Sequence, residues 1–407
     1  MKYLSFFTAL MLSVSLAFGQ NINDQKVTFD YIQLPLIKID PQFSQYNITV
    51  EHAYQQANDD STAVYEARRN FAAQAFEGAV AQYHKSCDSL DRIHWQNMAT
   101  WQKQVDAGVK NPDGTALVAP IAAPYPTPPV PQRIEEPMRH SDFNEASATN
   151  RVNLEGFTQG QGEVEVTLII HPIRSMRIGY KKEPTGTAAR YSFAAIYVMP
   201  IGLRVSTPSQ GVLLETMLSE KEAMYSLPSQ ETTYDHVLYM MDNKAAVFAQ
   251  VEAHARQTVL TEVNTYLNDQ FGFVKRTRTA EMYAVKSFKD YDYTDVTEAF
   301  TKATFALQAI GGSRNRSSAM TQLDEAIAAI ETILAESDMS DGKARINDKV
   351  TGMLQCNLAE LYVWKGDFNK SEGFANLALN GKGKASRHIK GEQAFYKEQR
   401  KRWEANF

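Results

Sequence analysis

Cysteine is scarce in this 407-residue chain, which holds only Cys87 and Cys356. Two cysteines allow at most one disulfide bond, which is too few for a disulfide framework. Both lie within apolar helical patterns, and a free cysteine behaves as a small buried hydrophobic residue. We therefore expect two free thiols, and a disulfide between Cys87 and Cys356 is the alternative.

The motifs of common catalytic and metal sites are also missing. The eight histidines form no HExxH pair and no Cys/His metal spacing, and neither a glycine-rich phosphate loop nor a GxSxG elbow occurs. Asp290, Asp292 and Asp295 lie close together, but the glycine and the glutamate of an EF-hand loop are lacking. We expect these aspartates to cap a helix, and the chain to need no cofactor and no metal.

Long hydrophobic runs are absent after the first 19 residues. Lys2 precedes an apolar stretch at residues 4–18, and Ala17-Phe18-Gly19 is a small-x-small cleavage site. This stretch is shorter than the ~20 residues that a membrane-spanning helix needs. We interpret residues 1–19 as a signal peptide, and expect an exported protein of the periplasm or outer membrane whose mature chain has no transmembrane segment.

Neither sign of charge dominates, since 42 Lys and Arg face 47 Asp and Glu. Phosphate binding needs clustered Lys and Arg, so nucleic acid is not expected as the main partner. The segment 381–407 is the basic exception. It is interpreted either as a contact for the outer membrane or another anionic surface, or as a solvated capping helix.

Hydrophobic alternation predicts strands on both sides of a long helix. The N-terminal segment 20–59 contains two such patterns, at residues 27–31 and 46–50. Segment 141–290 contains further alternating stretches separated by Gly- and Pro-containing turns, together with a helical pattern at 234–267. We expect the N-terminal strands to join a small antiparallel β domain in segment 141–290.

A long helical arm is predicted for residues 60–107, as an insertion in this β domain. Asp60 or Ser61 can cap it, and apolar positions recur every three or four residues along one stripe. Such a helix must lean on a second helix, a proline-rich strand or another subunit. Segment 108–140 holds more than half of the 15 prolines and predicts an extended return path, or alternatively a ligand for an aromatic groove through Tyr125.

The C-terminal segment 291–407 reads as helices joined by short loops, which is typical of stacked helical pairs. Asp295 and Glu298 have the spacing of a capping box at the start of the first helix. The helices are expected at residues 295–310, 318–336, 344–364, 369–379 and near 392–404.

Residues 357–380 resemble one unit of the tetratricopeptide repeat (TPR). The matching positions are Leu358, Ala359 and Tyr362 in the first helix, Gly366-Asp367-Phe368 in the turn, and Ala378 in the second helix. Ser371 stands where alanine is usual and Ala375 where an aromatic residue is usual. The chain as a whole resembles uncharacterised exported proteins of Bacteroidota, through QKVTFDYIQLPL, NDQFGF and KDYDYTD.

The TPR resemblance implies a partner-binding groove lined by the first helix of the unit. The groove residues that it implies are Met353, Cys356, Asn357, Glu360, Val363 and Trp364. Replacement of Asn357 and Glu360 by alanine is then expected to weaken partner capture without lowering thermal stability. The alternative is that these side chains pack against the terminal helix.

The sequence therefore predicts an α+β multidomain protein, with a small antiparallel β domain, a long helical arm and a C-terminal TPR-like array. Its expected function is that of an exported, non-enzymatic scaffold or adaptor that binds a protein partner in the cell envelope. One alternative is an envelope hydrolase with scattered carboxylates such as Glu163 and Glu165. The other is a structural protein that self-assembles through its long helix.

Overall fold

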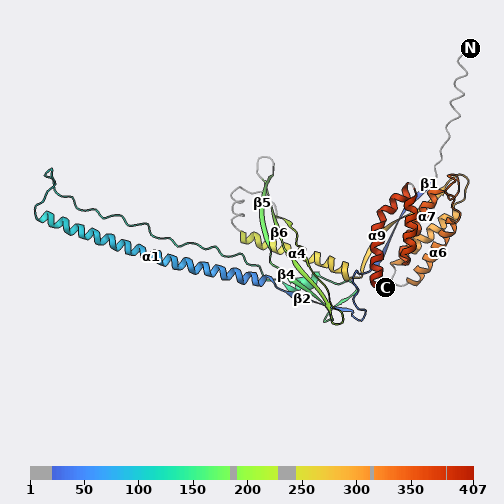
Figure 1. Cartoon of the computed structure of the whole chain (residues 1–407), viewed down its shortest axis with the longest axis horizontal. Coiled ribbons are helices and arrows are strands. Elements are labelled where there is room, and N and C mark those ends of the chain that lie inside the picture. The colour runs from blue at the N-terminus through green and yellow to red at the C-terminus, as the bar shows by residue number, and fades with distance from the viewer. Residues whose placement is uncertain (1–20, 184–189, 228–243, 312–315, 382) are drawn as a thin grey trace, which may run out of the picture.

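The computed structural model describes residues 21–183, 190–227, 244–311, 316–381 and 383–407. Within these ranges the protein is mixed α/β, with eight helices and three sheets. A helical arm, a central β region and a C-terminal helical unit follow one another in space (Figure 1). The predicted signal peptide and the start of the helix predicted at 234–267 lie outside the described residues.

The central sheet is mixed rather than antiparallel as expected. Its strands follow the order β3 (Thr158–Gln159), β2 (Gln45–Glu51), β4 (Val164–Ile170), β7 (Ile201–Thr207) and β8 (Gly211–Leu218). Strand β2 is parallel to β3 and β4, and the other pairs are antiparallel. Parallel neighbours need a long crossover connection, and the arm between β2 and β3 provides it.

A second sheet and one long helix complete the β region. The sheet has the order β5 (Ser175–Glu183), β6 (Arg190–Val198) and β9 (Ala223–Leu227), and helix α4 spans Lys244–Phe271. Val251, Val259 and Val263 of α4 are buried in one core with the inward side chains of the sheets. The short helix α2 (Glu145–Arg151) adds Ala148 to this core.

The first strand does not join the β domain. Strand β1 (Asn21–Gln33) pairs with β10 (Val274–Ser287) in an antiparallel ribbon, from Ile22 opposite Val285 to Gln33 opposite Val274. Of the two strands expected in segment 20–59, only β2 enters the central sheet. Val27 and Phe29 of β1 are instead buried in one core with the C-terminal helices.

Five helices form the C-terminal unit, and each contacts the next along the chain. They are α5 (Thr294–Ile310), α6 (Arg316–Leu334), α7 (Asp348–Lys365), α8 (Phe368–Asn380) and α9 (Lys384–Asn406). Gly366 ends α7 with a φ of 84°, a conformation that favours glycine. Helix α9 starts earlier than predicted because Ala385 and Ile389 bury its first turns.

The predicted capping box at Asp295 does not form. The Asp295 carboxylate accepts hydrogen bonds from both Arg345 Nη atoms and from the Val296 amide at 2.9 Å, and the N-cap position is taken by Tyr293, which makes no side-chain capping bond. Asp292 accepts instead from the Thr294 amide at 2.9 Å, so an aspartate of the cluster does bind the start of α5. Among the described residues, no group of acidic, His or Cys side chains is arranged to hold a metal ion.

The arm is built on α1 (Tyr54–Asp106), a helix of 53 residues that extends for about 80 Å. It begins before the predicted caps, so Asp60 and Ser61 lie inside the helix, and Ala53 at its start makes no side-chain capping bond. No described helix, α1 included, combines the length and apolar character needed to cross a membrane.

The proline-rich segment runs back along α1 as the predicted return path (Figure 1). Trp101 donates its indole N–H to the Leu117 carbonyl at 3.3 Å, and Tyr125 donates its hydroxyl to Asp91 at 2.7 Å. Of the α1 residues, Tyr54 alone is buried. The predicted apolar stripe, apart from the exposed Val105, is half-buried under the return strand, which is the extended segment 108–140 and forms no β-sheet. The arm therefore has a thin core and much exposed surface.

A buried polar cluster holds the base of the arm. Glu252 on α4 accepts hydrogen bonds from His140 Nδ1 at 2.7 Å, from the Ser141 hydroxyl at 2.7 Å and from Arg256 at 3.0 Å. Asn58 on α1 pairs with both the amide and the carbonyl of His140, at 2.8 and 2.9 Å. The end of the return strand is thus bound to both α1 and α4.

We expect Glu252→Ala to destabilise the protein by about 3–5 kcal/mol, because Arg256 would be left buried without its carboxylate. Burial raises the pKa of Glu252, but the hydrogen bonds from His140 and Ser141 and the charge of Arg256 outweigh it, so the net pKa is lowered. The contribution of ionised Glu252 to the free energy of unfolding is therefore complete above its unfolded-state pKa of about 4.3. It is lost as the pH falls through the lower pKa that Glu252 has in the folded protein.

Urea unfolding at several pH values, with proteolysis near residue 140 as a local probe, measures this effect. The stability gap between wild type and variant should narrow as the solution is acidified below about pH 4.3. Glu404→Ala, in an exposed pair with Arg400, is the control that should leave stability unchanged. A variant as stable and as protease-resistant as wild type would show that the cluster does not hold the arm.

Candidate functional site

The hollow of the C-terminal helices is filled by the β1–β10 ribbon. Asn357 on α7 accepts a hydrogen bond from the Tyr283 amide at 2.9 Å and donates to the Tyr283 carbonyl at 2.8 Å. Both bonds are buried. The Asn357 amide thus supplies the one donor and one acceptor that the backbone of a neighbouring β-strand would supply to Tyr283. The Asn357 side chain, which was predicted to line a partner-binding groove, therefore binds a strand of its own chain.

Glu360, one turn further along α7, forms the centre of a buried ionic cluster. Its two oxygens accept hydrogen bonds from Arg278 of β10 at 2.7 and 2.6 Å, and further bonds from Trp364 at 2.8 Å and Tyr396 at 2.9 Å. Arg278 also reaches Glu392 at 2.8 Å. The cluster joins β10, α7 and α9.

The contacts within this cluster change the pKa values of Glu360 and Tyr396. Burial alone would raise the pKa of Glu360, but the charge and hydrogen bonds of Arg278 hold it below its usual range. Burial raises the pKa of the Tyr396 phenol, and the Glu360 charge raises it further. The carboxylate therefore remains ionised and the phenol neutral at physiological pH, and this arrangement stabilises a contact within the chain.

The remaining predicted groove residues are also engaged. Trp364 packs edge-on against Phe29 and Tyr31 of β1, with ring centroids 5.1 and 4.9 Å apart. Met353 and Val363 are buried in the same core, as is Cys356. The prediction that Met353, Asn357, Glu360, Val363 and Trp364 line an open groove is thus corrected, since the first four are buried and Trp364 is half-buried against the same core.

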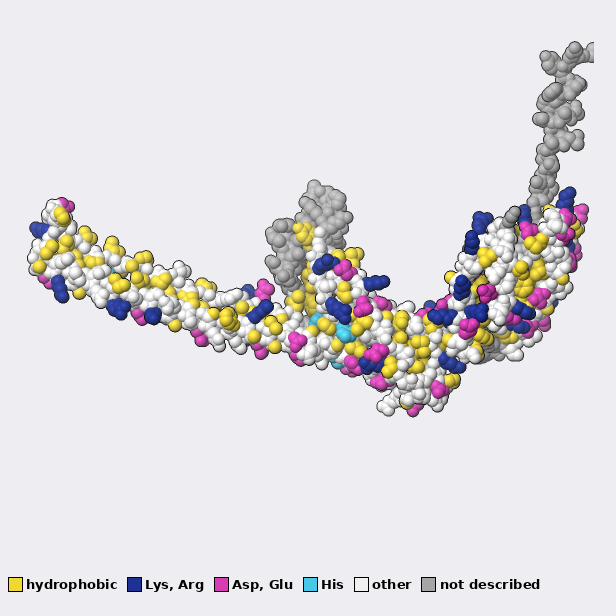
Figure 2. Space-filling model, in the orientation of Figure 1, with side chains coloured by type: hydrophobic (Ala, Val, Ile, Leu, Met, Phe, Trp, Pro, Cys, Tyr) yellow, Lys and Arg dark blue, Asp and Glu magenta, His cyan; other side chains and the backbone are white. Residues whose placement is uncertain are grey.

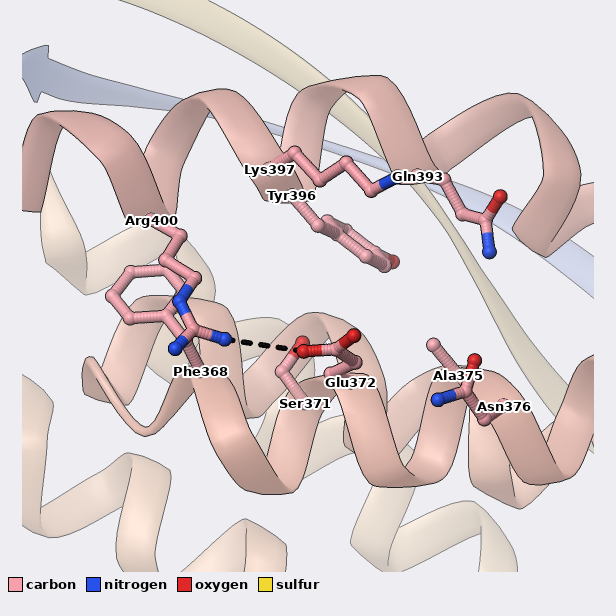
Figure 3. Close-up of a pocket in the computed structure, with 9 residues that line it drawn as sticks. All are labelled: Phe368, Ser371, Glu372, Ala375, Asn376, Gln393, Tyr396, Lys397 and Arg400. Carbon is pink, nitrogen blue, oxygen red and sulfur yellow. Dashed lines mark hydrogen bonds and ion pairs between the residues drawn. The ribbon is translucent and has the colours of Figure 1, made fainter.

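An open pocket of about 390 Å³ lies between α8 and α9 (Figure 3). Phe368, Ala375 and Tyr396 provide its apolar wall, and Arg400 reaches across it to Glu372 at 3.1 Å. Ala375 contributes only a methyl group to this wall. Its lining combines these apolar groups with the amides of Asn376 and Gln393 and with the charged Glu372, Lys397 and Arg400.

The basic segment contributes much of its charge to contacts within the chain. Lys384 pairs with Asp24 at 2.5 Å, and Arg402, nearly fully buried, pairs with Asp269 at 2.6 Å. Arg400 pairs with Glu372 and Glu404. The exposed cations that remain on α9 are Arg387, Lys390, Lys397 and Lys401.

Glu163 and Glu165 are both exposed, at and just before the start of β4. Glu165 accepts a hydrogen bond from the Thr49 hydroxyl at 3.3 Å. Neither carboxylate lines the pocket between α8 and α9.

The arm carries the most prominent exposed apolar side chains, and hydrophobic groups run along its whole length (Figure 2). On the return strand, Val118, Ile121 and Val130 are 81, 92 and 83% exposed. On α1, Phe71 and Trp95 are also exposed. No pattern in the sequence marks these residues, because helical periodicity reveals only the stripe of α1 that packs on the return strand.

No family model, curated protein or solved structure matches this chain.

We expect Glu360→Ala to destabilise the protein by about 3–5 kcal/mol, because it leaves Arg278 buried without its principal partner. This reverses the expectation for an open groove, in which the substitution would spare stability. Glu372→Ala, on the exposed surface of α8, is the matched control and should have little effect on stability. Thermal and urea unfolding measure both variants, and an unchanged stability of Glu360→Ala would contradict the packing role.

The two thiols should differ in reactivity. Cys87 and Cys356 are both free, and Cys87 lies half-exposed on the arm, whereas burial raises the pKa of the Cys356 thiol to about 12. A maleimide reagent at pH 8 should therefore label Cys87 in the folded protein and Cys356 only after unfolding. Mass spectrometry of the labelled peptides measures this, and an increase in the thiol count after reduction would reveal a disulfide.

Proposed function

We propose that this chain is an exported, non-enzymatic scaffold that binds a protein partner in the cell envelope through its arm. One observation carries the proposal: Val118, Ile121 and Val130 project from the return strand into solvent. Exposed apolar side chains gathered on a projecting element are typical of protein-binding surfaces. The buried hollow of the C-terminal helices offers no comparable surface, because the ribbon fills it.

The shape of the arm supports this role. Proline-rich backbone is stiff and extended, so the return strand presents its side chains with little loss of conformational entropy on binding. The buried cluster around Glu252 fixes the base of the arm to α4. A partner bound along the return strand is thereby held tens of ångströms away from the C-terminal unit, as expected of a scaffold.

We further propose that α7 and α8 form a TPR-type helical pair. Ala359 and Ala378 are buried where the two helices approach, and the Ser371 hydroxyl donates to the Ala359 carbonyl at 2.8 Å. Ser371 therefore fits at a position where a TPR unit usually has alanine, because its buried hydroxyl has a hydrogen-bond acceptor. In this proposal the pair acts as a support for the ribbon rather than as the partner-binding surface.

The triple variant Val118→Ser, Ile121→Ser and Val130→Ser tests the proposed surface. The partner is captured by crosslinking in the native envelope, identified by mass spectrometry, purified, and titrated against the mature chain by calorimetry. We expect the triple variant to bind it at least tenfold more weakly, with an unchanged melting temperature because the three side chains are exposed.

Thr127→Ser and Gln132→Ser alter exposed polar residues of the same strand and form the matched control. The control should bind like the wild type. Equal binding by the triple variant, or equal loss in the control, would reject the return strand as the binding surface.

A further inference from the structure

One face of α1 is left open by the return strand. At 3.6 residues per turn, Phe71 and Ile93 lie within about 20° of Val64 around the helix, so the three share one face. All three are exposed, Phe71 at 74%. The stripe under the return strand, which includes Tyr83 and Leu90, lies about a third of a turn away, so this face is a separate surface.

The centre of this face is made of small residues. Ala75, Gly78, Ser86 and Ser89 flank Gln82. Arg68 is the one charged residue within about 40° of the centre line of the face between Val64 and Thr100, and the exposed Lys85 lies at its edge, about 60° from that line. Glycine within a helix costs about 1 kcal/mol relative to alanine. A Cβ atom built at Gly78 would meet nothing within 4 Å, so the packing of the described chain does not require this glycine. A closely approaching second helix would require it.

The face is symmetric about Gln82. Phe71 and Ile93 lie at equal distances from Gln82 along the helix, as do Val64 and Thr100, and the small residues are paired in the same way. When two such helices cross antiparallel with Gln82 on a two-fold axis, Phe71 of one copy meets Ile93 of the other. The small residues then meet at the centre, where the helices are closest. This is the self-complementarity that an isologous dimer requires.

Charge and length agree with this pairing. In the antiparallel arrangement, Asp60 beside the face lies across from Lys103 of the second copy, and Arg68 meets the neutral Gln96. The helix from Val64 to Thr100 is about 54 Å long, or about ten turns. Two or three contact residues per turn give roughly the 20–30 residues per partner found in stable interfaces.

We propose that the occupant of this face is a second copy of the chain, and that two arms pair antiparallel about Gln82. The pairing adds to the proposed scaffold function and does not depend on it, because it uses α1 rather than the exposed side of the return strand. A dimer of this kind places the two C-terminal units at opposite ends of the paired arms.

Sedimentation of the mature chain tests the dimer. We expect a dimer at micromolar concentration and at least a tenfold increase in its dissociation constant for Gly78→Leu. Leucine favours the helix more than glycine does, so unfolding of the arm cannot account for the loss. Ala73→Leu places the same side chain on the opposite, exposed face of α1 and should change the dissociation constant less than twofold.

Disulfide formation between introduced cysteines tests whether the two α1 helices pair antiparallel. In a Cys87→Ser background, a mixture of Phe71→Cys and Ile93→Cys chains should form the mixed disulfide in preference to either homodimer. A monomer at 100 µM, a dimer indifferent to Gly78→Leu, or a preference for Phe71→Cys homodimers would each overturn the proposal. A monomeric chain whose return strand still binds the captured envelope protein would overturn the pairing alone.

Discussion

Asn357 and Glu360 hold the β1–β10 ribbon in the hollow of the C-terminal helices, and the architecture of that unit depends on this contact. Asn357 satisfies the backbone of Tyr283, while Glu360 neutralises Arg278 in a place from which water is excluded. A buried charge is tolerated only with such a partner. The ion pair therefore specifies where β10 lies against α7, in addition to any free energy that it contributes.

The arm is not stabilised by a buried ion pair or a packed core along its length, because Tyr54 is the only buried residue of α1. Its helix is long enough to gain cooperatively from backbone hydrogen bonds, and the return strand covers one apolar stripe. The base of the arm is held where Asn58 and Arg256 bind the backbone of His140 and Ser141 and Glu252 accepts from the Ser141 amide. A rigid element with so little buried surface leaves its other faces available, and a protein-binding role for the arm is consistent with that construction.

Local patterns in the sequence predicted most elements, because helix and strand periods are local properties. The stripe through Tyr83 and Leu90 located the long helix, and Gly366 located the turn between α7 and α8. The pairing of Phe29 with Arg278 was not predictable, because no local signal links residues so far apart in the chain. For the same reason, the sequence identified Asn357 and Glu360 as binding residues but assigned them to a separate partner rather than to a strand of this chain.

The ribbon also determines the order in which the protein can fold. Strand β1 is synthesised first, yet residues 34–273 separate it from β10, and the helices that cover both strands come last. Closing so long a loop is entropically costly and slow, so the ribbon forms late. Until α7 and α9 are complete, β1 remains an unpaired apolar strand that is prone to aggregate. The apolar side chains of β1 are therefore without their native cover until translation reaches the C-terminal helices.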